Sequence, residues 1–546
     1  MFSNPRCFVL GWLTLLILLA AFVRIQGSDL YHFHVDELMH MKIAEGATLK
    51  QVFDYSLFEA HPPLGHILRH YWNMVSQSIT WARSLSLVFG LAMIPLYYLI
   101  GKKLNDELTG MCAATLIAFS HGCIIQSYVV RNYSMFSFFI SAAFYYYLLW
   151  HDERTDNKLL VWYVFWGLCA VLTHFSGIFA ISIIVCWELL QLFRKKQATR
   201  VYIKWLAVNA AIGITSVITI FLWHGTLNPI ETFVVHETAV FMPSYGIRIF
   251  MLTPLYLIHV VDYIFIRPAF VYVLAFLIPI AIAREDESIA LVKLGACAFL
   301  LGVLLFMGSI YPFAGDRHGL WLLPFLISPA AWMLADIFRK VSKKPAIAAL
   351  LILICGLLSY DASGRFDDSL EYKITERQWK DISAYLGNLD DKTLLFAGKT
   401  DAIMLASPGV NIYGAILNPA YAISPISAKI PYYNTQLLFD KTYRMYTENI
   451  IKIFENSYTN HTMDHYDRLV FVSTFVPSDI MADLILCPEL DKKLVSFPAA
   501  EPGHVFVHDD LRKFDVIFME VDKQIFFNEF VAPNGKARKC LRKQII

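Results

Sequence analysis

Residues 7–25 read CFVLGWLTLLILLAAFVRI, an almost unbroken apolar run. A helix that crosses the hydrocarbon core of a bilayer needs about 20 such residues. Because no small-residue cleavage site follows, the run is interpreted as an uncleaved membrane anchor rather than a signal peptide. We therefore expect a membrane helix at this position.

The composition extends this interpretation to the whole chain. Of its 546 residues, 57% are hydrophobic and 17% are charged, whereas soluble domains are about 25% charged. So many apolar side chains do not fit inside a water-soluble core. The 46 basic and 45 acidic residues leave no basic excess for nucleic acid. A soluble enzyme, a disordered chain and a nucleic-acid-binding protein are excluded, and membrane lipids become expected partners.

Apolar runs of spanning length recur along residues 1–360. They predict an α-helical polytopic membrane protein with about eleven transmembrane helices. The stretch 247–266 is also apolar, but its polar residues indicate a partly interfacial segment, so the count stays open by one or two. The expected spans are 7–25, 82–101, 108–127, 131–150, 159–175, 177–193, 205–224, 268–283, 290–310, 319–338 and 345–360.

Basic residues orient these spans. When the N-terminus is placed inside the cell, the inward loops contain more lysine and arginine than the outward loops, which is the positive-inside pattern. Eleven spans then place the C-terminus outside. The inward basic residues are Lys102, Lys103, Arg154, Lys158, Arg194, Lys195, Lys196, Arg200, Lys204, Arg284, Arg339, Lys340, Lys343 and Lys344.

Residues 361–546 have a different character from the spans before them. They are polar, with helical periodicity at 374–388. We expect a separate extracytoplasmic α/β domain here, in which Cys487 and Cys540 can pair if the compartment is oxidising. The expected strands are Thr393–Ala397, Arg468–Ser473, His504–Val507 and Val516–Val521.

The first outward loop, residues 26–81, is dense in ionisable groups. Residues 31–40 read YHFHVDELMH, and residues 61–66 read HPPLGH. More polar residues flank later spans on the same membrane face, namely Arg131, His174 and the Asp316-Arg317-His318 triplet. Charged groups near a bilayer core are costly and usually line a cavity. The pattern predicts a polar site for a lipid-borne ligand.

Simpler explanations apply to some of these residues. Arg69 and Arg248 fit a snorkelling role at the lipid surface better than a catalytic one. Pro62-Pro63 suits the first turn of a helix over 64–76, whose apolar spacing is typical of a helix on the membrane surface. Asp36-Glu37 also suits the N-terminal end of a helix, where the dipole favours acidic residues.

The order of four motifs resembles the membrane-embedded GT-C glycosyltransferases. The nearest types are the protein O-mannosyltransferases and the aminoarabinose lipid A transferases, and the likeness covers about residues 7–360. One departure is His318-Gly319, where relatives often have Tyr-Leu. The motifs are Asp36-Glu37 after the anchor helix, HPPL at 61–64 with RSLSLVFG at 83–90, VRNYS at 130–134, and DRHGLWLLP at 316–324.

This resemblance implies an inverting transfer of sugar from a polyprenyl-phosphate carrier to an outer-face acceptor. It implies that Asp36 is the catalytic carboxylate, which accepts the proton of the acceptor hydroxyl. Glu37 would orient the acceptor, support Asp36 or bind an ion. Arg131 and Arg317 are the candidate ligands of the donor phosphate, because a guanidinium fork matches phosphate geometry.

Other residues receive weaker assignments. His174 is a further candidate donor to the phosphate, and substrate-binding candidates are His61, Arg83 and His318. A divalent metal is an open alternative, because His32, His34 and His40 beside the acidic pair are ligand types that zinc accepts. Their spacing matches no defined metal motif, so metal-independent catalysis is the preferred interpretation.

Three rival functions have distinguishable signatures. A transporter or lipid flippase tends to show inverted repeats and midplane sites, whereas here the ionisable groups gather at one outer rim. A non-catalytic cell-envelope assembly protein does not need carboxylates and arginines on one face. A ligase or polymerase of longer lipid-linked glycans stays open within the enzymes. The sequence names neither the sugar nor the acceptor, which can be a lipid, a glycan or a protein. The resemblance favours the bacterial inner membrane over the endoplasmic reticulum.

Overall fold

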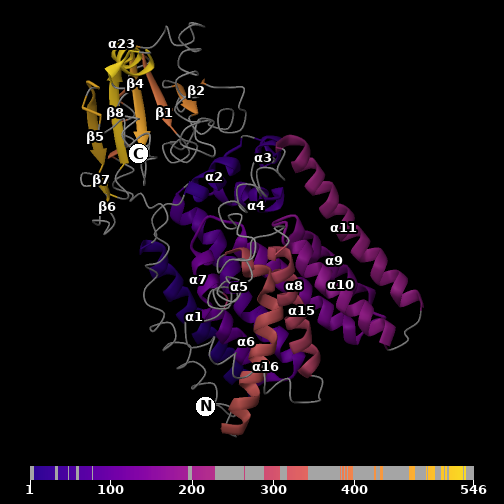
Figure 1. Ribbon diagram of the computed structural model, residues 1–546. Coiled ribbons are helices and arrows are strands. Elements are labelled where there is room, and N and C mark those ends of the chain that lie inside the picture. The colour runs from indigo at the N-terminus through magenta and orange to yellow at the C-terminus, as the bar shows by residue number, and fades with distance from the viewer. Residues whose placement is uncertain are drawn as a thin grey trace. The chain divides into compact units, whose positions relative to one another are not determined.

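The fold is described from a computed structural model (Figure 1). Its first compact unit comprises Met1–Leu30 and Ile43–Asp368, and its second comprises Tyr31–Lys42 and Ser369–Ile546. Each unit is described by itself. The structure describes residues 5–30, 35–46, 48–56, 61–76, 78–194, 199–227, 264, 288–307, 317–341, 381–382, 384–385, 388–389, 392–397, 423–425, 431–434, 467–473, 487–488, 490–497, 506–508, 511–512, 516–532 and 534–536.

The first unit is a bundle of helices (Figure 1). Helix α2 contributes its last two residues to this unit and its first eight to the second. The described helices are α1 (Pro5–Leu30), α2 (Val35–Ala44), α3 (Leu49–Ser56), α4 (Pro63–Asn73), α5 (Ile79–Leu104), α6 (Glu107–Phe119), α7 (His121–Ser127), α8 (Tyr133–Asp152), α9 (Asn157–Val171), α10 (Gly177–Arg194), α11 (Thr199–Leu227), α15 (Ser288–Met307), the 3-10 helix η2 (Arg317–Leu322) and α16 (Leu323–Val341).

Several helices in the described residues have the length and composition of membrane spans. Five meet both criteria, and a sixth is added if α6 and α7 are counted as one. Helices α8 and α9 also lie where spans are expected, although α9 has only 15 residues. The expected spans 268–283 and 345–360 lie outside the described residues.

The expectation of one continuous helix over 108–127 is wrong. Helix α6 ends at Phe119, and α7 leaves it at an angle of 57°. Ser120 causes the break, because its extended backbone ends α6 and its hydroxyl accepts the N–H of Cys123 as the cap of α7. Arg24 of α1 binds the exposed end of α6 by donating to the carbonyl of Ala118 at 2.8 Å.

Small residues allow α5 and α6 to approach closely. A β-carbon on Gly101 would lie 2.5 Å from the carbonyl oxygen of Thr109, and one on Gly110 would lie 2.6 Å from that of Tyr98. Membrane helices use such small residues for tight packing, because lipid supplies no hydrophobic force between helices. At the adjoining end, Arg339 of α16 binds Asp106, the N-cap of α6, at 3.0 Å.

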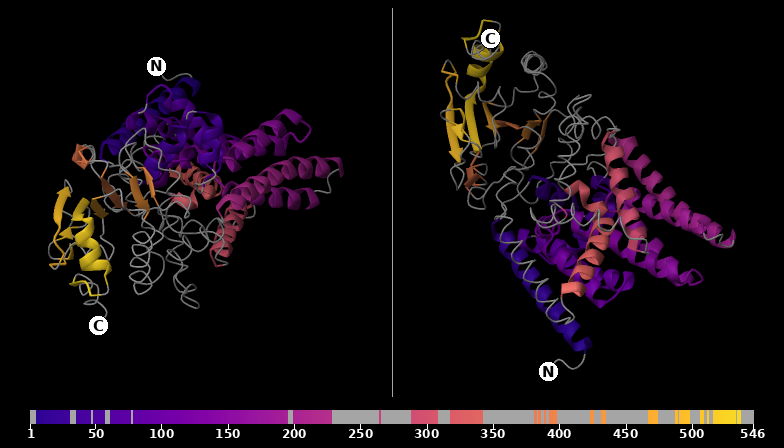
Figure 2. Two further views of the ribbon diagram at one scale, coloured as in Figure 1. Left: turned by 90° about the horizontal axis from the view of Figure 1, so that it is seen from above. Right: turned by 60° about the horizontal axis from the view of Figure 1, so that its bottom comes forward.

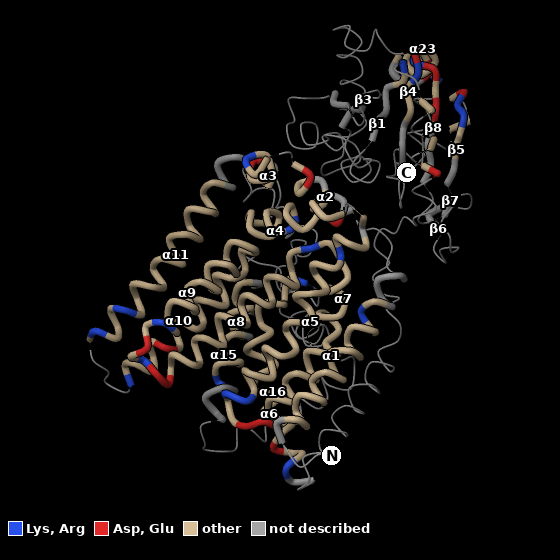
Figure 3. Tube along the Cα trace, turned by 180° about the vertical axis from the view of Figure 1, so that it is seen from behind, with Lys and Arg blue, Asp and Glu red and all other residues tan. Residues whose placement is uncertain are grey.

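The outer surface of the bundle is apolar along its length. Leu18 and Phe22 of α1 and Ile214 and Phe221 of α11 are at least 59% exposed. Helices α9, α10 and α11 extend on the side of the bundle away from α1 (Figure 2). Most charged residues lie toward the ends of the helices (Figure 3). This distribution is that of a protein whose long helices face lipid.

The second unit contains a six-stranded mixed sheet in the order β2-β3-β1-β4-β8-β5. Strand β1 pairs in parallel with β3 and β4, whereas β8 runs antiparallel to β4 and β5. Two further strands, β6 and β7, form a separate pair. The strands are β1 (Thr393–Ala397), β2 (Ile423–Pro425), β3 (Pro431–Asn434), β4 (Arg468–Ser473), β5 (Lys493–Phe497), β6 (Phe506–His508), β7 (Leu511–Arg512) and β8 (Val516–Asp522).

Polar contacts support this sheet from one side. Glu520 of β8 lies between Lys493 of β5 at 3.2 Å and Arg468 of β4 at 3.8 Å. The hydroxyl of Tyr385, which belongs to the expected helical segment 374–388, donates to the same carboxylate at 2.8 Å. Burial, followed by this bond, raises the pKa of Tyr385 above its ordinary value. Cys487 is disulfide-bonded, and Cys540 lies outside the described residues.

Candidate functional site

Helix α4 starts at one edge of the predicted site. Pro62 is its N-cap in extended conformation and Pro63 is its first residue, which suits proline because a first-turn residue needs no N–H partner. The N–H of Leu64 donates to the carbonyl of Leu172, just after α9, at 3.0 Å. This bond joins the segment that carries His61 to the turn that carries His174.

The faces of α4 are the reverse of those in a soluble helix. His66, Arg69 and Asn73 are buried in the protein, whereas Tyr71 is 51% exposed and Val75, just after the helix, is 72% exposed. Exposed apolar and aromatic side chains suit a helix on the bilayer surface. The surface position of α4 stays a prediction.

The non-helical segment between α7 and α8 carries Arg131. Arg69 of α4 donates to the carbonyl of Arg131 at 3.2 Å and to that of Ala82 at 3.1 Å. Ser86 of α5 donates to the carbonyl of Val129 at 2.7 Å. The expectation that Arg69 snorkels to lipid is wrong, because its side chain is fully buried and donates to backbone carbonyls inside the protein.

Tyr133, the first residue of α8, lies at the centre of the predicted site. Its ring centroid is 5.5 Å from that of His61, 5.1 Å from that of His174 and 6.3 Å from that of His318. The guanidinium carbons of Arg131 and Arg317 lie 5.7 and 5.9 Å from the same ring centre. We call this set the Tyr133 cluster: Tyr133, His61, Arg131, His174, Arg317 and His318.

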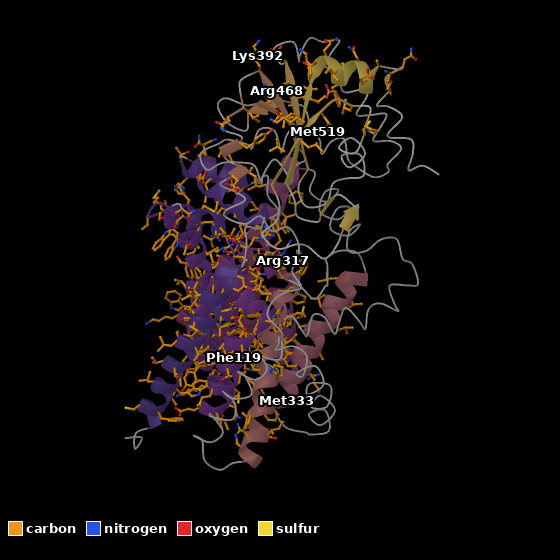
Figure 4. The ribbon with its side chains drawn as sticks, turned by 90° about the vertical axis from the view of Figure 1, so that its left-hand side faces the viewer. Phe119, Arg317, Met333, Lys392, Arg468 and Met519 are labelled. Carbon is orange, nitrogen blue, oxygen red and sulfur yellow. The ribbon has the colours of Figure 1, made fainter. Side chains whose placement is uncertain are left out.

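The Tyr133 cluster is largely withdrawn from solvent. Tyr133 is 1% exposed and Arg131, the most exposed of the buried members, is 7% exposed. Arg317 is half-buried at the start of η2, which continues into α16. Figure 4 shows Arg317 near one end of this segment and Met333 further along α16. In such water-poor surroundings charges interact more strongly than in bulk water.

The tautomer of His174 follows from its bonds. Its Nδ1 accepts the backbone N–H of Ser176 at 3.2 Å and lies 2.7 Å from the hydroxyl of Ser176. A ring nitrogen that accepts an N–H is unprotonated, so the neutral ring carries its proton on Nε2. His174 is thereby fixed as a hydrogen-bond donor through Nε2.

The electrostatics of the cluster favour an anion. Two guanidinium groups converge on one neutral ring, and α8 starts at that ring with the positive end of its dipole. Guanidinium forks bind phosphate oxygens in a bidentate way. The arrangement can hold a phosphate group and stabilise negative charge on it.

The remaining predicted residues lie elsewhere or outside the described part of the chain. Arg83 is buried near the start of α5. Glu37 and His40 are buried in α2, in the portion assigned to the second unit. The side chain of Asp36, together with His32 and His34, lies outside the described residues. Within the described residues, no group of three or more His, Cys, Asp or Glu side chains could hold a metal ion.

Sequence reasoning missed three contributors to the site. Tyr133 belongs to the VRNYS motif at 130–134, in which residue type points to Arg131 alone. Arg69 is predicted at the lipid surface, and nothing in the sequence marks Ser176. The only sequence signal for Tyr133 is its position beside a candidate arginine, whereas the bonds of Arg69 and Ser176 depend on tertiary structure.

Comparisons with known proteins decide the class. The family model of the dolichyl-phosphate-mannose-protein mannosyltransferases matches residues 34–228, which contain α2 to α11 with His61, Arg131, Tyr133 and His174. The structure of ArnT from Cupriavidus metallidurans bound to undecaprenyl phosphate is similar over 93% of this chain and 98% of that chain, with a TM-score of 0.56 and 12% identity. The chain has the fold of the GT-C membrane glycosyltransferases, and its residues 34–228 match the mannosyltransferase family model.

Two further solved structures complete the comparison. Apo ArnT from the same organism has a TM-score of 0.55 at 11% identity, over 93% of this chain and 98% of that chain. Archaeal oligosaccharyltransferase AglB from Archaeoglobus fulgidus, in complex with an inhibitory peptide and a dolichol-phosphate, has a TM-score of 0.49 at 12% identity, over 96% and 77%. Comparison with curated proteins gave no match. At these identities the ArnT structures establish the fold alone.

The predicted resemblance, fold class and enzyme class are confirmed. The chain is an integral membrane protein. The matched family region supplies four of the six members of the Tyr133 cluster, and η2 supplies Arg317 and His318 from outside it.

Proposed function

We propose that this glycosyltransferase moves a sugar, with inversion at the anomeric carbon, from a polyprenyl-phosphate carrier to an acceptor on the outer face of the membrane. The Tyr133 cluster is the observation that supports this proposal. It combines two arginines, three histidines and a helix N-terminus in one water-poor place.

The cluster suits the leaving group of this reaction. As the bond between the anomeric carbon and the phosphate oxygen breaks, its electron pair passes to the phosphate. Arg131 and Arg317 are placed to stabilise that charge, and His174 adds an N–H donor. Fixed donors at a developing charge are typically worth about 10²–10³-fold in rate each.

Asp36 completes the mechanism as general base. The acceptor hydroxyl attacks the anomeric carbon from the face opposite the phosphate, and its proton passes to the Asp36 carboxylate. General base catalysis of this kind contributes about 10²–10⁴-fold. Glu37, the next residue along α2, orients the acceptor or supports Asp36.

The donor and acceptor follow as classes. The matched family is named for dolichyl-phosphate-mannose and one similar structure holds undecaprenyl phosphate, so the proposed donor is a polyprenyl-phosphate sugar. The acceptor is a lipid, a glycan or a protein hydroxyl. Arg83 is proposed as a further substrate-binding residue because it is buried near the start of α5.

The outer side is the proposed location of the sheet domain. The disulfide at Cys487 requires an oxidising compartment, which the periplasm or the lumen of the endoplasmic reticulum provides. We place the enzyme in the bacterial inner membrane with its site and second unit facing the periplasm.

Mass spectrometry of polyprenyl-phosphate lipids tests the function. Cells carrying Asp36→Asn should accumulate one glycosylated carrier that cells carrying the wild type consume, and its mass gives the sugar. Asp54→Asn is the matched control, because Asp54 lies in α3 of the same loop, where it pairs with Lys50 at the surface.

Three results distinguish the possibilities. Accumulation with Asp36→Asn but not with Asp54→Asn supports transfer and the role of Asp36. Equal lipid profiles in all three strains, with each protein folded, contradict the assignment of Asp36 as the base. A carrier that accumulates on the inner face alone would favour a flippase.

A further inference from the structure

Asn132 is a buried polar residue that the mechanism above does not use. It lies between Arg131 and Tyr133 and is fully buried. Within the described part of the chain, neither its Oδ1 nor its Nδ2 has a hydrogen-bond partner. A buried amide without partners is costly, and such groups in native proteins usually have a functional reason.

Helix capping does not explain this asparagine. Asn132 is the N-cap of α8, a position where asparagine normally accepts a backbone N–H from the first turn. Ser78, Asp106 and Asp156 do so at the starts of α5, α6 and α9, whereas the side chain of Asn132 makes no such bond. Its amide is directed elsewhere.

The amide lies against the first turn of α4. A β-carbon built on Gly65 would lie 2.4 Å from Cγ of Asn132 and 2.5 Å from its Oδ1. Gly65 follows His61 of the Tyr133 cluster by four residues. Asn132 therefore lies beside the cluster, and any side chain at position 65 would displace its amide from this position.

We propose that the carboxamide of Asn132 binds hydroxyl groups of the sugar that is transferred. This inference rests on the proposed function. A carboxamide offers both a donor and an acceptor. A phosphate oxygen satisfies only the donor, and the arginines already supply donors to a phosphate, whereas a pair of sugar hydroxyls satisfies both atoms. Asn132 then determines which sugar is used, while Arg131 and Arg317 hold the phosphate common to all carriers. The amide is closed to solvent, so sugar binding requires α4 to move away from Asn132.

Binding of defined lipids to the purified full chain tests this division. The probes are undecaprenyl phosphate and its mannose-, glucose- and galactose-linked forms. The wild type should bind at least one sugar-linked form more tightly than the bare carrier. Asn132→Leu should lose about 10-fold of affinity for that form, the equivalent of one to two hydrogen bonds, and bind bare carrier as the wild type does.

Ser137→Ala is the matched control. Ser137 lies on the same helix, is 1% exposed and has an Oγ without a partner in the described residues. Both variants remove an unsatisfied buried polar group, so both should match or exceed the wild-type Tm. Only Asn132→Leu should change the preference for sugar-linked over bare carrier. If Asn132→Leu does not fold, Asn132→Ala provides the same comparison.

The outcomes separate this inference from the function on which it rests. A wild type that binds none of the four lipids overturns the proposed function. A wild type that binds the carriers without preferring any sugar-linked form, or a preference that survives in Asn132→Leu, overturns the role of Asn132 alone. Equal loss of affinity for bare and sugar-linked carriers makes Asn132 a phosphate ligand and also overturns the proposal.

Discussion

Helix α8 carries a polar cluster at each end, and the two differ in charge. At its first residue, arginines and histidines surround the neutral ring of Tyr133. Near its last turn, the fully buried Glu188 of α10 accepts from Tyr147 at 3.0 Å and lies 2.6 Å from Nδ1 of His151. Arg154 lies 2.9 Å from the same carboxylate.

The contrast separates a structural cluster from a binding cluster. At the Glu188 end, a carboxylate and its cations belong to one chain and hold α8 against α10, so the protein alone balances the charge. Around Tyr133, two guanidinium groups converge on the face of one aromatic ring. The proposed function adds a bound phosphate to this arrangement, so the two ends should respond differently to mutation.

The largest effect is expected from the arginines around Tyr133. Arg317→Ala should lower transfer by about 10²–10³-fold, because it removes a fixed cation from the developing phosphate charge. Tm should change little, since Arg317 is half-buried. The measurement is the rate of transfer from the donor identified by mass spectrometry. An unchanged dependence on donor concentration would contradict the phosphate role.

A large effect on stability is expected at the opposite end. Glu188→Ala leaves Arg154 and His151 without their buried carboxylate, which should destabilise the protein by about 3–5 kcal/mol. Thermal unfolding of the purified protein measures this change. The rate of transfer per folded molecule should stay near the wild-type value. A loss of transfer without a loss of stability would show that the Glu188 end also takes part in the reaction.

The smallest effect on transfer is expected from substitutions of Tyr133. Tyr133→Phe keeps the aromatic face toward both arginines and should reduce transfer by less than about threefold. Tyr133→Leu removes that face and should cost about fivefold, on the order of 1 kcal/mol. Steady-state rates of the two variants give the comparison. Equal losses in both would show that the hydroxyl, not the ring face, is the important feature.

Local pattern predicted part of the fold well. The strands Thr393–Ala397 and Arg468–Ser473 have the predicted bounds, because runs of alternating or apolar β-forming residues are a local signal. Strand β5, Lys493–Phe497, was not predicted. Its five residues carry a weak pattern, and pairing with β8 decides their conformation.

The site was predicted where residue type alone suggested chemistry. Five predicted residues meet around Tyr133, since topology places the ends of several helices close together. Hydropathy did not reveal the break at Ser120, because a capping hydroxyl hardly changes an apolar average. Nor did it reveal the inward direction of Arg69, which depends on carbonyls 13 and 62 residues away along the chain.

The reversed faces of α4 have a consequence for depth. On the predicted bilayer surface, a helix with exposed Tyr71, followed by exposed Val75, settles at one level. Through Arg69 it fixes the backbone of Arg131 at a set height relative to that level. Lipid phosphates also occupy a narrow layer near the surface of the bilayer. The enzyme and any membrane-anchored phosphate therefore meet at matched depth, which reduces the search for substrate from three dimensions to lateral diffusion in two.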